Sequence, residues 1–165
     1  MIELLVFDVD GCLTDGGIEY GNGDNEEFKT FNVKDGFAIV SWMKLGKKSA
    51  IITGRASRVV ERRAKELGIS YLYQDVKNKK QVLESILEKE GLSFENVAAI
   101  GDDLNDLGLL RSVGISFAPA DAVKQVCDEV TVVLSKAGGK AAVREMIDIV
   151  IEKENLSEEF IKLWV

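Results

Sequence analysis

The first apolar run of the chain ends in two aspartates, Asp8 and Asp10, which stand two residues apart and are followed by Gly11. Asp and Gly also form ordinary surface turns, but a lone carboxylate at the tip of an apolar strand is costly without a nearby cation. If the chain leaves the sheet here, Gly11 permits the backbone angle that turns both side chains toward one open site. Two such carboxylates can bind a metal ion or carry out nucleophilic and acid–base chemistry.

A second apolar run ends in Thr53, Gly54 and Arg55. The threonine hydroxyl and the free backbone amides at a helix start can hold phosphate oxygens, and the arginine can add a bidentate contact. This pattern is weak alone, because Thr-Gly also begins ordinary helices. It predicts a phosphate site only if the other candidate residues converge on the same place.

A later apolar run ends in an acidic cluster that contains Asp102, Asp103 and Asp106. Helix capping explains one of these acids but not all three. A Mg²⁺ ion prefers oxygen ligands from one or two carboxylates, and Asp8, the backbone carbonyl of Asp10 and Asp102 fit that preference. The metal would also offset the repulsion between an anionic phosphate and these acids.

Other residue types narrow the chemistry. Lys77, Lys79 and Lys80 follow the third apolar run, and spacing alone does not choose which of them faces the site. The absence of histidine excludes Ser-His-Asp triads and His-ligated metals. Neither Cys12 nor Cys127 has an arginine six residues later, as a cysteine phosphatase would need. Any catalysis or metal binding must therefore come from carboxylates, lysine, threonine and arginine.

Strands and helices must alternate to position these residues. Short apolar runs, typical of strands buried on both faces, lie at residues 2–7, 49–52, 71–73, 97–100, 114–117 and 130–133. Helical periodicity appears between them, at residues 37–45, 59–67, 82–87, 104–110 and 141–151. The alternation predicts a doubly wound, mainly parallel, Rossmann-like α/β sheet, with ligands at the carboxyl ends of the strands.

One segment interrupts the alternation. Residues 14–32 contain two short apolar stretches around a polar turn at residues 22–25, which predicts a β-hairpin beside the end of the first strand. We expect one domain over residues 1–165, with a C-terminal helix and tail at residues 139–165. The tail at residues 160–165 is too apolar for a free end, so we expect it to pack on its own core or on a neighbour.

Composition excludes several partners. A formal charge of −7 argues against nucleic acid and anionic membranes, which need a basic face. The sequence has no apolar run long enough to span a membrane and begins without the basic segment of a signal peptide. Two cysteines cannot form a disulfide framework. We therefore expect a cytoplasmic protein that binds a small molecule.

The ordered set of motifs resembles that of the haloacid dehalogenase superfamily, whose members share four motifs at strand ends. The matching residues are Asp8-x-Asp10-Gly11, Thr53, a downstream lysine and Gly101-Asp102-Asp103. The resemblance implies a magnesium-dependent phosphatase. Its expected roles are Asp8 as nucleophile, Asp10 as general acid/base, Thr53, Gly54 and Lys79 for phosphate, and Asp8, Asp10 and Asp102 for the metal, with Asp103 in support.

The intervals between the motifs indicate a member without a cap domain. Positions 9–52 hold only the hairpin and one helix, and positions 80–101 only a helix and a strand. An open site favours a large substrate or closure by another subunit.

Further runs are similar to 3-deoxy-D-manno-octulosonate 8-phosphate phosphatases. They are Asp8 to Gly16, Asn32-Val33-Lys34-Asp35-Gly36, Ile52-Thr53-Gly54-Arg55, Gly138-Gly139-Lys140 and Arg144-Glu145. The resemblance implies a homotetramer of the lipopolysaccharide sugar pathway, in which a neighbouring subunit helps to cover the site. Two positions depart from the pattern, since Cys12 replaces an expected valine and Ala141 an expected glycine.

An acidic protein that binds an anionic sugar needs fixed cations near its site, and Arg55, Arg63 and Lys34 are the candidates. Arg55 is best placed, beside Thr53, whereas surface solubility explains Arg63 and Lys34 equally well.

Three other readings remain. A nine-carbon sugar-acid phosphatase shares much of the pattern. A catalytically silent binding subunit is disfavoured because every motif residue is present. A phospho-acceptor receiver domain is disfavoured because its acceptor follows the third strand, which here ends Tyr73-Gln74-Asp75.

Overall fold

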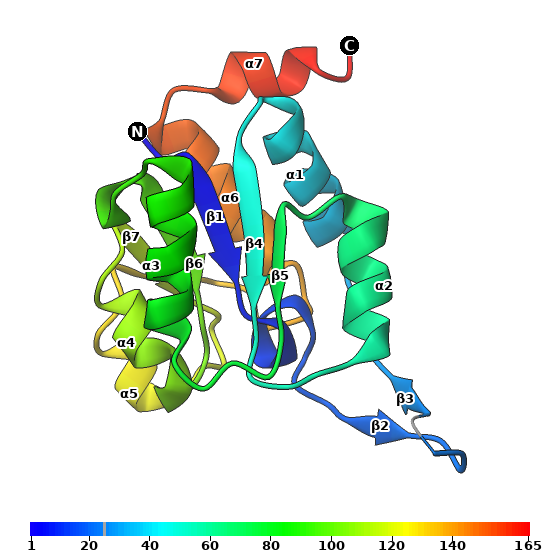
Figure 1. The fold of residues 1–165 in the computed structure, drawn as a ribbon. Helices are drawn as coiled ribbons and strands as arrows, with labels where there is room; N and C mark the ends of the chain where they lie inside the picture. Colours follow the sequence, from blue (N-terminus) through cyan, green and yellow to red (C-terminus); the bar gives the residue numbers. More distant parts are fainter. Residues whose placement is uncertain (25) are drawn as a thin grey trace.

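A six-stranded parallel sheet forms the centre of the computed structural model, which describes residues 1–24 and 26–165 (Figure 1). The strand order is β5-β4-β1-β6-β7-β8, and every neighbouring pair is parallel. The strands are β1 (Leu4–Phe7), β4 (Lys48–Ile52), β5 (Tyr71–Tyr73), β6 (Val97–Ile100), β7 (Ile115–Ala118) and β8 (Val132–Val133). The predicted fold class is confirmed, although the first and last strands are shorter than predicted.

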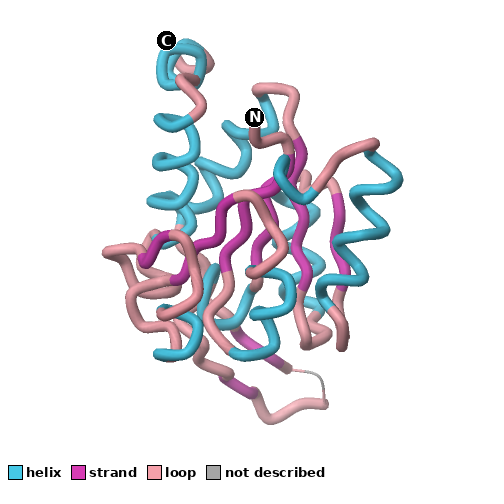
Figure 2. The backbone as a smooth tube through the Cα atoms, turned by 90° about the vertical axis from the view of Figure 1, so that its left-hand side faces the viewer, coloured by secondary structure: helices cyan, strands magenta, loops and turns pink. Residues whose placement is uncertain are grey.

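Helices cover both faces of this sheet, as the side view in Figure 2 shows. The helices that flank it are α1 (Val33–Lys44), α2 (Arg58–Leu67), α3 (Lys79–Glu90), α4 (Leu107–Leu110), α5 (Lys124–Cys127) and α6 (Ala142–Lys153). Leu5 and Phe7 of β1 pack on the face covered by α1, α2 and α6, whereas Leu4 and Val6 pack on the face covered by α3, α4 and α5. This alternation explains why β1 is fully apolar, since both sets of side chains are buried. A further helix, α7 (Ser157–Lys162), follows α6 near the C-terminus.

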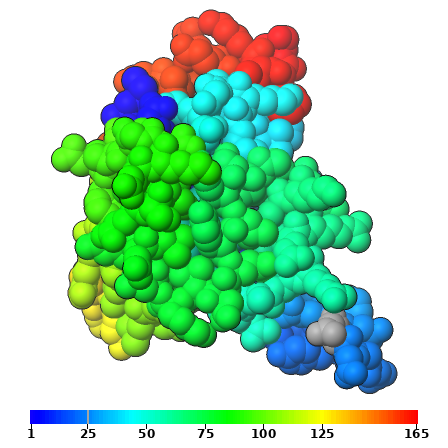
Figure 3. Space-filling view, in the orientation of Figure 1, coloured from blue at the N-terminus to red at the C-terminus, as the bar shows by residue number. Residues whose placement is uncertain are grey.

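A two-stranded ribbon, β2 (Glu19–Tyr20) and β3 (Glu27–Phe28), forms within the segment predicted to be a hairpin. It projects beyond the carboxyl end of β1 and away from the body of the molecule (Figures 1 and 3). Asn25, in the predicted turn, lies outside the described residues. Tyr20 and Phe28 of the ribbon are 69% and 56% exposed, so their apolar surfaces face solvent in the isolated chain.

The C-terminal tail folds back over α1. The Trp164 ring lies 4.5 Å from that of Phe37, centroid to centroid, and its Nε1 donates a hydrogen bond to Ser41 Oγ at 3.1 Å. The tail therefore packs on its own chain. No helix among the described residues combines the length and the apolar character that a membrane crossing requires.

Candidate active site

The carboxyl end of β1 lies at the middle of the sheet, between β4 and β6. Asp8 follows β1 directly, and its backbone N–H donates to the Ile100 carbonyl at 3.2 Å, which extends the pairing with β6 by one residue. Thr53 follows β4, and Asp102 lies two residues beyond the end of β6. Adjacent parallel strands thus bring together at one edge side chains that are far apart in sequence.

A tight loop turns the chain after Asp8. Gly11 adopts φ +88°, and a Cβ on it would lie 2.1 Å from Asp102 Oδ2, so only glycine allows Asp102 to approach this closely. The buried Thr14 hydroxyl donates to the Val9 carbonyl at 3.3 Å and accepts from Gly16 N at 3.2 Å. Gly138 packs on the same loop, because a Cβ there would lie 1.9 Å from the Gly11 carbonyl oxygen.

Lys79 is the cation at the centre of the acidic cluster. Asn78 caps α3 by accepting from Gln81 N at 3.1 Å, which makes Lys79 the first helical residue. The Lys79 side chain is 2% exposed, and its Nζ lies 3.0 Å from Asp8 Oδ1 and 2.6 Å from Asp106 Oδ1. Of the three lysines that spacing left open, the structure buries this one among the acids.

The sequence analysis assigned no role to Asp106, which the structure places between Lys79 and the backbone of Asp102. Its Oδ2 accepts hydrogen bonds from the backbone N–H groups of Asp102 at 3.0 Å and Asp103 at 3.4 Å, while its Oδ1 contacts Lys79. Asp103 is exposed and caps the short turn at Leu104–Asp106. The spacing of Asp103 and Asp106, a cap residue and an acid three residues later, was the available signal.

Burial and mutual repulsion shift the pKa values of these groups. Burial, followed by the charge of Asp106, raises the pKa of Asp8 to about 6. Burial, followed by the charges of Asp8 and Asp106, raises the pKa of Asp102 to about 7. Burial alone would lower the pKa of Lys79, but the two carboxylates beside it raise it overall. The cluster therefore carries more negative charge than one ammonium neutralises.

Asp8, Asp102 and Asp106 fit a divalent cation. Each offers a carboxylate oxygen, and these atoms all lie within 4.8 Å of one another. A hard cation prefers such oxygens, and a charge of +2 would relieve the repulsion that raises the pKa values of Asp8 and Asp102. The carbonyl of Asp10 remains a predicted additional ligand.

Mg²⁺ is expected to raise the Tm of the wild-type protein, because a ligand that binds only the folded state stabilises it by about 2.7 kcal/mol at a hundredfold excess over Kd. Asp102→Asn should lose most of this shift in a thermal-denaturation series with and without EDTA. Asp15→Asn, which changes an exposed acid on the loop after β1, should keep it. A full shift in Asp102→Asn would contradict this assignment of the ligand.

A cavity of about 240 Å³ lies at the strand ends and is lined by Asp8 and Asp102, but not by Asp106 or Lys79. Thr53, Gly54, Arg55 and Asp103 contribute to its wall, together with Asp8, Asp10, Gly16, Asp102 and Asn105. Lys34 is exposed and does not line it, and Arg63 lines a separate surface groove with Phe31 and Glu66. Of the three substrate-binding candidates, only Arg55 reaches the cavity.

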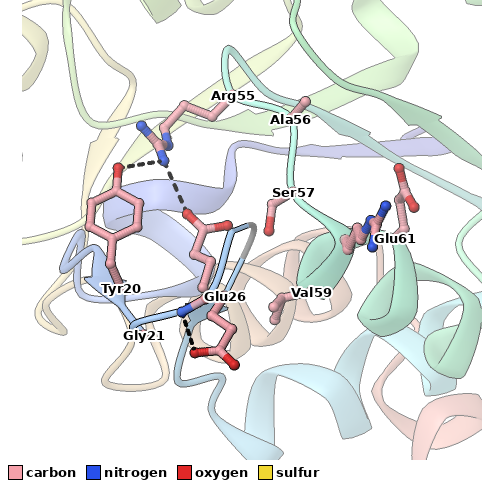
Figure 4. A pocket seen from close by; sticks show the side chains of 11 residues that line it. Tyr20, Gly21, Glu26, Arg55, Ala56, Ser57, Val59 and Glu61 are labelled. Carbon is pink, nitrogen blue, oxygen red and sulfur yellow. Dashed lines mark hydrogen bonds and ion pairs between the residues drawn. The ribbon is translucent and has the colours of Figure 1, made fainter.

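A larger groove, about 440 Å³, lies beside the cavity between the hairpin and the start of α2 (Figure 4). Arg55 lines both hollows and donates from Nη2 to Glu27 Oε1 at 3.0 Å and to Tyr20 Oη at 3.5 Å. The hydrogen bonds to Tyr20 and Glu27 raise the pKa of the Arg55 guanidinium. The groove is not lined by Asp8, Asp102 or Asp106, so we place the chemistry in the smaller cavity.

Comparisons with known proteins agree with this geometry. A haloacid dehalogenase-like hydrolase family profile matches residues 71–147. The chain is 43% identical over 158 residues, 96% of its length and 84% of the relative, to 3-deoxy-D-manno-octulosonate 8-phosphate phosphatase KdsC of Escherichia coli K12.

Solved structures of such phosphatases superpose closely on the chain. The enzyme from Moraxella catarrhalis, in complex with magnesium ion, phosphate ion and KDO, has a TM-score of 0.94 and 38% identity, covering 99% of this chain and 94% of that one. The cobalt-bound enzyme from Haemophilus influenzae has a TM-score of 0.91 and 37% identity, covering 97% and 93%.

Proposed function

Because the chain belongs to the family of 3-deoxy-D-manno-octulosonate 8-phosphate phosphatases, within the haloacid dehalogenase-like hydrolases, we propose that it hydrolyses a sugar-acid phosphate. The names of these relatives point to 3-deoxy-D-manno-octulosonate 8-phosphate as the first substrate to test. The observation that carries the proposal is the cluster at the strand ends, in which the buried Asp8, Asp106 and Lys79 meet the half-buried Asp102. Such a cluster suits phosphoryl transfer to a carboxylate.

Asp8 is the proposed nucleophile. One carboxylate oxygen attacks phosphorus, the bond from phosphorus to the sugar oxygen breaks, and an aspartyl-phosphate forms on Asp8. Lys79, 3.0 Å from Asp8 Oδ1, holds this carboxylate in place. Thr53 and the backbone of Gly54 line the cavity where phosphate oxygens would lie. A bound Mg²⁺ would offset the negative charge shared by phosphate and carboxylates.

Asp10 is the proposed general acid/base. It follows Asp8 by two residues on the loop and lines the same cavity. A proton on its carboxyl passes to the leaving sugar oxygen as the bond to phosphorus breaks. The resulting carboxylate then takes a proton from the water that attacks the aspartyl-phosphate, which releases phosphate and restores both aspartates.

The proposed setting is a cytoplasmic homotetramer that acts in lipopolysaccharide sugar synthesis, as the resemblance to cap-free sugar-acid phosphatases implies. Two observations support a partner subunit: the described residues form no cap domain over the cavity, and the hairpin exposes Tyr20 and Phe28 beside it.

Phosphate release in the presence of Mg²⁺ tests the proposed function. The panel compares 3-deoxy-D-manno-octulosonate 8-phosphate with a nine-carbon sugar-acid 9-phosphate and with a sugar phosphate that lacks the carboxylate. We expect the highest kcat/KM on the eight-carbon acid and loss of release with EDTA. Preference for the nine-carbon acid would change the assigned substrate but leave the proposed mechanism in place. No phosphate release from any ester would favour a catalytically silent binding subunit.

A further inference from the structure

Lys29 is a buried cation of the hairpin segment that the proposed mechanism has not used. It follows β3 by one residue, and its side chain is 0% exposed. Its Nζ donates to Asp10 Oδ1 at 2.5 Å and lies 3.5 Å from Glu27 Oε1. Burying an ammonium is costly unless partners compensate for the lost hydration. Here two carboxylates compensate: that of Asp10, on the loop after β1, and that of Glu27, on the hairpin itself.

The two oxygens of Asp10 therefore have different environments. Oδ1 accepts the hydrogen bond from Lys29, whereas Oδ2 lies 3.7 Å from the Nε atom of Arg55, a residue that lines the cavity. Arg55 is in turn tied to Glu27 and Tyr20, so both cations beside Asp10 are anchored to the hairpin. Figure 4 shows Arg55 reaching across to Tyr20. Asp10 keeps 21% of its side chain exposed, which leaves it accessible to a substrate.

From this asymmetry, and on the basis of the proposed function, we propose that Lys29 is a positioning residue for the general acid/base Asp10. An ammonium can only donate, so it occupies Oδ1 whether or not the carboxyl carries its proton. The transferable proton is then confined to Oδ2. From there it passes to the leaving sugar oxygen and later returns from the attacking water. The hairpin thereby orients the group that transfers the proton.

A simpler role would be to stiffen the hairpin through the Lys29–Glu27 ion pair. The two roles differ in their dependence on the leaving group. An alkoxide leaves poorly unless Asp10 protonates it, whereas 4-nitrophenolate leaves without a proton. Loss of positioning should slow the first step for a sugar phosphate and spare it for 4-nitrophenyl phosphate. A distorted site would slow both.

The test measures pre-steady-state kinetics of Lys29→Met with both esters. On 3-deoxy-D-manno-octulosonate 8-phosphate, we expect the rate of the first step to fall roughly 100-fold, within the contribution of general acid–base catalysis. On 4-nitrophenyl phosphate, the burst of nitrophenolate should keep its rate to within about threefold. The later turnover should be slow, because the water step still needs Asp10 as a base.

Two further variants complete the design. Glu27→Gln removes the other partner of Lys29 and should not change the ratio of the two first-step rates. Lys29→Gln, of similar length but uncharged, undergoes the same comparison if Lys29→Met does not fold.

Equal losses of the first-step rate on both esters, or no loss of that rate on the sugar phosphate, would overturn the proposal. A wild-type protein that cleaves neither ester would instead overturn the proposed function.

Discussion

Asp8→Asn is expected to abolish phosphate release, with a loss of roughly 10⁴-fold or more, as follows removal of a catalytic nucleophile. An amide has nearly the shape of a carboxylate but does not form an acyl phosphate. The measurement is phosphate release with Mg²⁺, together with mass spectrometry of acid-quenched protein. The wild type should show a phosphorylated species that the variant lacks.

This loss should not come from unfolding. The pKa of Asp8 is raised from 3.8 to about 6, chiefly by burial, so the folded state holds this proton more tightly than the unfolded state. Stability then falls as the pH rises through that interval, and the ionised Asp8 destabilises the metal-free protein at neutral pH. Asp8→Asn should therefore have a Tm in EDTA no lower than that of the wild type. Asp15→Asn, an exposed acid of the same loop, is the control and should keep its activity.

The sheet and most of the candidate site followed from pattern, because parallel strands buried on both faces leave a clear apolar signature. Three of the buried runs are followed by polar residues that the fold brings together. In β1, β4 and β6 these residues are Asp8, Thr53 and Asp102. The order of the strands made their convergence a consequence of topology rather than of any local signal.

Asp106 and Lys29 were not assigned because their roles depend on contacts between distant segments. In the sequence, Asp106 has the spacing of a residue that helps to cap a helix. Only the fold shows that its Oδ1 accepts a hydrogen bond from Lys79. Lys29 reads as a surface lysine of a hairpin, and only the fold shows that it is buried against Asp10. Composition favoured cations near the site but could not place Lys34 and Arg63, which do not line the cavity in the single chain. Their role in substrate binding stays a prediction.

The Gly138–Gly139 loop shows how a motif can be correct in position and different in detail. Gly139 adopts φ +70°, and so does Ala141, the alanine that replaces an expected glycine. An alanine in this left-handed region costs about 1 kcal/mol or more. The chain therefore keeps the backbone conformation that a glycine would favour, and the loop still packs on the catalytic turn at Gly11.

Lys79→Met is expected to lower kcat by roughly 10²–10³-fold, comparable to the loss of a charge-stabilising group in an active site. It is also expected to lower the free energy of unfolding in EDTA by about 3 kcal/mol, because breaking a buried ion pair leaves charges without a partner. Here Asp8 and Asp106, 3.0 Å and 2.6 Å from the ammonium, would face each other uncompensated. Phosphate-release kinetics and urea denaturation at neutral pH measure the two effects.

Lys77→Met is the matched control, two residues earlier in the chain. Its side chain is 86% exposed, and its only recorded ion pair among the described residues is with Asp75 at 3.3 Å, a surface contact of little energetic value. It should leave both kcat and the urea midpoint unchanged. Stability of Lys79→Met should also improve on acidification, because protonation of Asp8 relieves the repulsion that the lost ammonium had balanced. Burial raises the pKa of Asp8 to about 6 even with Lys79 present, and loss of the ammonium raises this pKa further. Wild-type activity in Lys79→Met, or loss of activity in Lys77→Met, would show that Lys79 is not the lysine that acts in the site.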